Sequence, residues 1–113
     1  MSTEFFEVRE DDNSLSGEQR LFLAILAQLA HDLSVKVETM KFQYERTGFV
    51  ANSVNRDMRR IYNEAMHEWC ETICMLADYD RDSFVSQINR MVGEVSNYPV
   101  IPDNQHQRLS VAN

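Results

Sequence analysis

Glycine and proline are scarce in this chain, which has three glycines and two prolines among its 113 residues. Long stretches without either residue favour helices over a β architecture, which needs many turns. No apolar run approaches the ~18 residues that span a membrane, and acids stand near the N-terminus where a secretory signal would be basic. We therefore expect a soluble, cytoplasmic protein of the all-α class with no membrane partner.

Cysteine is also rare, and Cys70 and Cys74 stand four residues apart on a predicted helix. Side chains in that arrangement rarely close a disulfide, so a cross-linked secreted scaffold is not indicated. His67 completes the one cluster of metal-ligand types, but His67 and Cys74 would lie roughly 10 Å apart along the helix axis and cannot share one ion. His67 and Cys70 would need ligands from another segment.

A cysteine–histidine nucleophile at the same place would lack an oxyanion hole and an orienting acid. We therefore predict no metal, no cofactor and no enzymatic activity. Metal or thiol chemistry at His67, Cys70 and Cys74 is the least favoured alternative.

Positive charge is in deficit, since the formal net charge is −7 and the sequence pI is about 4.8. Generic affinity for nucleic acid is therefore not expected, and any DNA contact needs a local basic patch. Part of the imbalance lies in residues 1–13, which we interpret as an acidic flexible arm. The acids of this arm that we expect to contact a partner are Glu7, Glu10, Asp11 and Asp12.

Residues 14–96 form the predicted helical domain. Ser16 followed by Gln19 is typical of a capping box, and a row of apolar residues follows at helical spacing. The residues expected to face the core here are Leu21, Phe22, Ile25, Leu26, Leu29 and Leu33. Residues 34–52 fit either a helix or a strand, and we favour the helix. The dipeptide Thr47-Gly48 breaks the pattern, and Asn52 or Ser53 can cap a second helix.

The second long helix is predicted to run to about Ala77, and a tight turn at residues 78–80 leads to a last helix capped by Asp80. On the second helix the core side is expected to carry Met58, Ile61, Tyr62, Ala65, Trp69, Ile73 and Leu76. On the last helix it is expected to carry Phe84, Val85, Ile88, Met91, Val92 and Val95. Both prolines follow Asn97, so residues 97–113 are predicted to be an irregular tail.

The result is a bundle of three to four helices with a helix-turn-helix-like pair. In such a motif the second helix presents short polar and cationic side chains to base edges. The residues of that kind are Ser83, Ser86, Gln87 and Arg90, and preceding cations suited to phosphate are Arg56, Arg59 and Arg60. The same composition also suits a merely solvated helix face.

Three stretches of the chain, 18–24, 69–74 and 76–80 with Val85 after it, resemble small uncharacterised proteins of phages and prophages. The resemblance covers about two thirds of the chain. It implies a helix-turn-helix-containing accessory factor with a regulatory or host-directed role.

Our leading hypothesis is a phage-type accessory protein that binds a protein partner through the helix pair 56–95 and modulates or inhibits it. Acidic proteins can occupy basic grooves on other proteins, which fits the charge. The alternative is a dimeric transcriptional regulator that reads DNA. Wide apolar helices in so small a domain also predict a homodimer or higher homo-oligomer.

Overall fold

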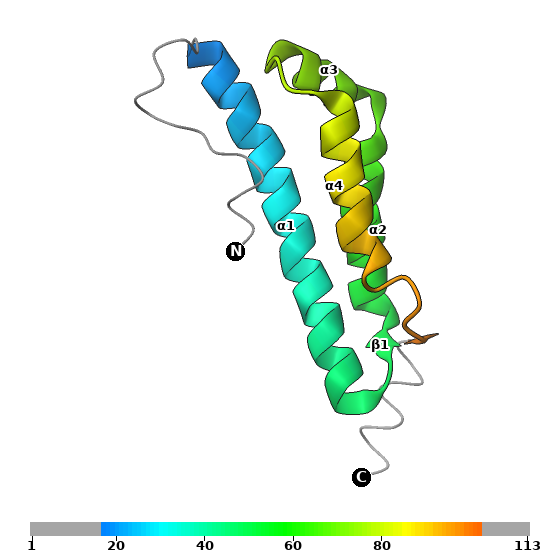
Figure 1. Cartoon of the computed structure of the whole chain (residues 1–113). Coiled ribbons are helices and arrows are strands. Elements are labelled where there is room, and N and C mark those ends of the chain that lie inside the picture. Colours follow the sequence, from blue (N-terminus) through cyan, green and yellow to red (C-terminus); the bar gives the residue numbers. More distant parts are fainter. Residues whose placement is uncertain (1–16, 103–113) are drawn as a thin grey trace.

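The protein is a small all-α bundle in the computed structural model, which describes residues 17–102. Its helices are α1 (Gly17–Thr47), α2 (Asn52–Met66), α3 (Glu68–Leu76) and α4 (Arg81–Gly93), and two short strands are β1 (Val50–Ala51) and β2 (Val100–Ile101). In Figure 1, α1 runs the length of the molecule, α2 returns beside it, α3 lies at the far end and α4 runs back. This confirms the predicted fold class. Among the residues described, no helix has the length and apolarity needed to cross a membrane.

The long helix α1 continues through the stretch where sequence allowed either helix or strand. The buried residues Leu26, Ala30, Leu33, Val37 and Met40 follow one another in steps of four and three, and buried Leu29 lies beside them. That spacing is the heptad pattern of a helix packed along one seam, and it outweighs the two-residue alternation around Val37. The helical prediction for this stretch is therefore confirmed.

One residue expected in the core of α1 lies outside it. Leu21 keeps 59% of its surface exposed, because it stands on the side of the helix away from the buried seam. Phe22 and Leu23, which flank the seam, are the residues that pack against the core at this end.

A glycine ends α1, and a short parallel bridge follows. Gly48 adopts a φ of 84°, and its N–H donates to the Tyr44 carbonyl over 2.8 Å, so the last turn closes with a left-handed residue. Val50 and Ala51 then pair with Val100 and Ile101. The predicted irregular tail therefore contains a strand, while residues 103–113 lie outside the described part.

The start of α2 also differs from the prediction, which placed a capping side chain at Asn52 or Ser53. The N-cap position is held by Ala51, and no side chain caps the helix there. The cause is β1, which runs directly into the helix and fixes the backbone of Ala51. The Gln43 side chain accepts a 3.0 Å hydrogen bond from the Ala51 N–H.

The predicted single helix from residue 52 to 77 is broken at His67, which separates α2 from α3. The break changes which residues reach the core. Cys70, Cys74 and Ala77 are buried, whereas Trp69 and Leu76, expected inward, are 40% and 49% exposed. The buried stripe continues five residues after Ala65 instead of four. One extra residue in the repeat thus rotates α3 relative to α2 and places two cysteines where larger residues were expected.

The turn between α3 and α4 is built from backbone hydrogen bonds. The Tyr79 N–H donates to the Cys74 carbonyl over 2.9 Å and the Asp78 N–H donates to the Met75 carbonyl over 3.1 Å. Together with a φ of 55° at Asp78, these bonds form a Schellman motif. Asp80 then caps α4 as predicted, accepting from the Ser83 N–H over 2.9 Å.

Candidate functional site

A hollow runs along the outer face of α2. We call it the α2 groove, and its volume is about 720 Å³. Its lining comes from α2, the break after it and the start of α3: Asn52, Asn55, Arg56, Arg59, Arg60, Asn63, Glu64, His67 and Trp69. Most of these recur at steps of three and four, so they share one side of the helix. Met58 and Ala65 face the core from the opposite side.

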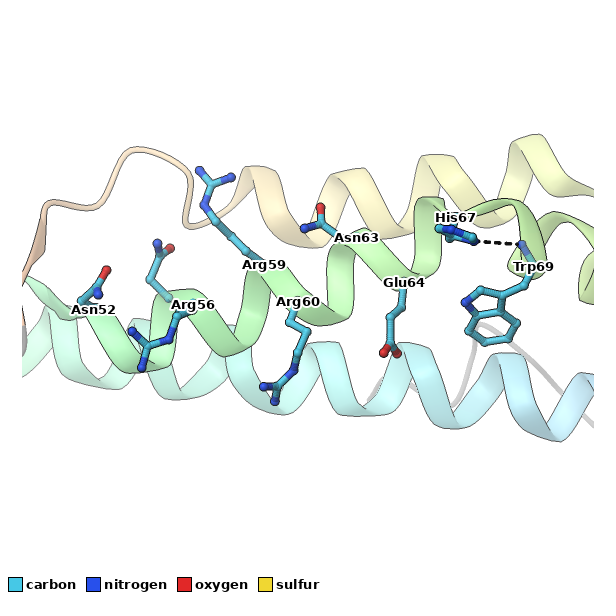
Figure 2. A pocket seen from close by; sticks show the side chains of 9 residues that line it. Asn52, Arg56, Arg59, Arg60, Asn63, Glu64, His67 and Trp69 are labelled. Atoms are coloured by element: carbon cyan, nitrogen blue, oxygen red, sulfur yellow. Dashed lines mark hydrogen bonds between the residues drawn. The ribbon is translucent and has the colours of Figure 1, made fainter.

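Arginine dominates the charge of the α2 groove. Figure 2 shows the guanidinium groups diverging: Arg59 points toward α4, and Arg60 points toward α1. Arg60 lies 3.5 Å from Asp57, which also lies 3.5 Å from Lys36 of α1. Arg59 is exposed and makes no ion pair within the described part of the chain. Three arginines thus form a local basic patch on a protein whose net charge is −7.

The groove ends at the helix break. The His67 Nδ1 accepts a 3.3 Å hydrogen bond from the Trp69 N–H, drawn as a dashed line in Figure 2, and so caps α3. The indole of Trp69 lies beside Glu64 at this end of the groove and is 40% exposed. Exposed tryptophan and arginine side chains are both enriched among the residues that contribute most to protein–protein binding.

Arg81 stabilises the break, a role that sequence reasoning missed. The end of α2 at Met66 leaves carbonyl groups without helical partners. The Arg81 Nη2 donates to the Met66 carbonyl over 3.3 Å, which ties the start of α4 to the end of α2. No local sequence pattern signals this bond, because the two residues are fifteen positions apart.

The predicted contact residues of α4 come together in a second, smaller hollow of about 250 Å³. Its lining consists of Ser83, Ser86, Gln87 and Arg90 with two acids, Asp80 and Asp82. Hydrogen bonds from the Ser83 hydroxyl and N–H hold the pKa of Asp80 below its ordinary value. This hollow therefore carries negative charge at the N-terminal end of α4, where a recognition helix would meet DNA.

Gln87 is less exposed than expected. It is half-buried, its side chain hydrogen-bonds Tyr79, and its Oε1 is buried without a partner. Its side chain thus supports the turn before α4 in addition to lining the hollow.

Both cysteines are buried in the core rather than displayed. Their thiols are hydrogen-bonded to each other, and burial raises the pKa of Cys70 to about 11. Burial likewise raises the pKa of Cys74. A reactive cysteine needs a lowered pKa, so these thiols lack the property of a nucleophile. Within residues 17–102, no group of three His, Cys, Asp or Glu side chains is placed to hold a metal ion.

The predicted site residues thus divide between two hollows. Arg56, Arg59 and Arg60 line the α2 groove, and the α4 residues line the smaller hollow. The acids Glu7, Glu10, Asp11 and Asp12 lie outside the described residues.

Comparisons of the chain with protein-family models, with curated proteins and with solved structures find no match. The resemblance to phage proteins therefore stays a prediction.

Proposed function

We propose that this chain is a non-enzymatic accessory protein of the phage type, which binds a host protein through the α2 groove and modulates or inhibits it. One observation carries the proposal. Three arginines of α2 and an exposed tryptophan at the start of α3 line one groove within an otherwise acidic chain. Arginine and tryptophan are the residues most often found at energetic centres of protein interfaces.

The partner's surface follows from the chemistry of the groove. Guanidinium groups form bidentate hydrogen bonds with carboxylates, and the asparagines of the groove offer amide donors and acceptors. The part of the partner that meets α2 therefore carries acidic side chains, which differs from the basic groove expected from the net charge of the chain. The α2 groove is open along a helix of 15 residues, or about 22 Å, which suits a helical or extended segment of the partner.

The experiment compares two single substitutions in captures from a bacterial lysate. Arg59→Ala removes one exposed arginine from the groove, and Arg46→Ala removes one from the end of α1. A protein retained by the wild type and by Arg46→Ala, but bound at least tenfold more weakly by Arg59→Ala, supports the proposal. Equal binding by both variants would remove the α2 groove from the function.

DNA binding is the second candidate, because the four polar α4 residues do share one hollow. The acids Asp80 and Asp82 in that hollow repel phosphate and count against it. Arg90→Ala separates the candidates: it weakens a DNA complex and reduces its salt dependence, and it leaves a complex made through α2 intact. No shift of duplex DNA by the wild type at low salt ends the DNA candidate. We also propose that the chain self-associates, as a claim separate from binding through the α2 groove.

A further inference from the structure

The outer face of α1 carries apolar residues where a surface helix is usually polar. Leu21, Val35 and Phe42 are 59%, 47% and 58% exposed. They are separated by 14 and 7 residues, and Gln28 occupies the position between Leu21 and Val35. We call Leu21, Gln28, Val35 and Phe42 the α1 row.

The α1 row lies on the side of α1 opposite the core seam. Val35 comes two residues after buried Leu33 and two before buried Val37, and each step turns the helix by about 200°. The rest of the bundle therefore packs against one side of α1 and the row faces away. On a straight helix, residues seven positions apart are offset by about 20° around the axis per heptad. Two helices that coil around each other compensate for this offset, so a row with a seven-residue repeat stays in contact along its length. The spacing thus fits a helical partner better than a flat surface.

We propose that the α1 row is the contact surface of a homodimer in which α1 of a second copy packs antiparallel to it. In a two-fold arrangement centred between His31 and Asp32, Leu21 faces the second copy's Phe42 and Gln28 faces its Val35. Each member of the row then has a partner from the same set, as an isologous interface requires.

Charge decides between the two orientations. Glu38 and Glu45 flank the C-terminal half of the row, whereas Ala24 and His31 flank its N-terminal half, and all four are exposed. In a parallel pair, Glu38 and Glu45 would each lie beside the same residue of the second copy, and such contacts between like charges are destabilising. In the antiparallel pair Glu38 lies opposite Ile25 and Asp32 lies opposite His31, and only Glu45 meets an acid, Glu18. The antiparallel pair therefore has fewer like-charge contacts than the parallel pair, in which every acid faces its own copy.

The size of the surface indicates a weak dimer. The 31 residues of α1 extend about 46 Å, and a helix is about 10–12 Å wide, so the footprint is on the order of 500 Å² per copy. A standard stable interface buries about 800 Å² per partner. Dissociation in the micromolar range is therefore expected, with monomers prevailing at low concentration.

The first experiment is sedimentation of the full chain over roughly 1 to 300 µM, a range that brackets micromolar dissociation. The wild type should rise from 13.2 kDa toward twice that mass. Val35→Glu should weaken the dimer at least tenfold, because it buries one charge from each copy near the two-fold axis, opposite Gln28, which cannot neutralise it. Met75→Glu is the control: Met75 is 71% exposed but lies on α3, so the dimer should be unchanged. A monomer throughout, or equal effects of both variants, overturns the proposal.

Cross-linking tests the orientation. A mixture of the Gln28→Cys and Val35→Cys variants should form a disulfide between one variant and the other, since the antiparallel register brings these positions together. Cys70 and Cys74 are buried and should not compete. Disulfides only within each variant would mean a parallel pair and would overturn the proposal. The row shares no residue with the α2 groove, so its failure leaves the proposed function untouched.

Discussion

The two halves of the bundle bury their apolar side chains with different arrangements of helices. The first half is one helix, α1, of 31 residues, while residues 52–93 are divided among three helices. Both halves bury a stripe of apolar side chains against each other. In α1 the buried residues other than Leu29 follow one another in steps of four and three, and Leu29 lies three residues after Leu26, so one straight helix can present them all. Beyond Ala65 the next buried residue comes five positions later, and no continuous helix can keep that stripe facing the core.

This difference shows where a helix needs residues that cap or end it. A helix with a regular buried stripe needs capping residues only at its two ends, and Gly48 ends α1 in this way. Where the buried stripe is irregular, the helix is broken, and each break exposes backbone groups that need hydrogen-bond partners. His67 caps α3, Arg81 bonds the last carbonyl of α2, and Asp78 takes a left-handed conformation at the end of α3. The candidate groove lies along the interrupted half and ends at the break itself.

The strongest test of the comparison concerns the core seam of α1. Leu33→Ala should lower the free energy of unfolding by about 2–5 kcal/mol, because it leaves a cavity at a fully buried position. Val35→Ala, two residues away on the exposed side, should change it by less than about 0.5 kcal/mol when measured on the monomer. Urea denaturation at low protein concentration gives both values. Similar costs at the two positions would mean that the seam does not hold α1 in place.

The two left-handed residues that end α1 and α3 should respond in opposite directions. Gly48→Ala should destabilise the protein by about 1 kcal/mol, because an L-residue is strained at a φ of 84°. Asp78→Gly should stabilise it by up to about 1 kcal/mol, since it relieves the same strain at a φ of 55°. Thermal unfolding measures both changes.

Gly93→Ala is the control for this pair. Gly93 closes α4 with a negative φ, and a Cβ there would meet nothing within 4 Å. Replacement should stabilise the protein slightly, by about 0.5–1 kcal/mol. A loss at Gly93 as large as that at Gly48 would show that the backbone conformation is not the cause.

The cap at the helix break should have a smaller effect. His67→Ala removes the acceptor for the Trp69 N–H and should cost about 0.5–1 kcal/mol, near the lower end for lost caps because the bond is long at 3.3 Å. His67→Asn keeps an acceptor of the N-cap type and should recover most of the loss. Fluorescence of Trp69, the single tryptophan of the chain, reports the change at the site during unfolding. Equal stability of the two variants would mean that the cap contributes nothing.

The sequence predicted the regular parts of the fold. Leu26, Leu29 and Leu33 of α1, the cap at Asp80 and the inward residues Phe84, Ile88 and Met91 follow from periodicity and side-chain chemistry, and the structure confirms them. Leu21, predicted in the same row, is exposed. The break at His67 was missed because residues 58–76 also fit a continuous helical stripe. Choosing between Trp69 and Cys70 as the buried residue depends on packing against α1, which one segment does not reveal.

The candidate site was predictable only in pieces. Arg56, Arg59 and Arg60 were identified as cations on one side of a helix, and they do line the α2 groove. The prediction treated these arginines and the α4 residues as parts of one contact surface. The structure places the α4 residues in a separate hollow. The parallel bridge was missed because strands of two residues carry no periodic signal. Its partners are fifty residues apart in the chain.

The smallest effect concerns a bond that ties the regular half to the end of the interrupted half. Lys41 of α1 lies 2.6 Å from Glu94, just after α4. Glu94→Gln should cost only about 0.2–1 kcal/mol, because the pair is partly exposed and screened by salt. Glu38→Gln is the control, since Glu38 contacts Lys41 within α1 and joins no separate elements. The bond to Glu94 is the main cause that raises the pKa of Lys41 above its ordinary 10.5, so its stabilising effect is complete below that pH and is lost as the pH rises further. The difference in unfolding free energy between the wild type and Glu94→Gln should therefore stay constant from neutral pH to about 10 and shrink above 10.5. A difference that persists at higher pH would assign the effect of Glu94 to packing, and α1 would then be joined to α4 by the core alone.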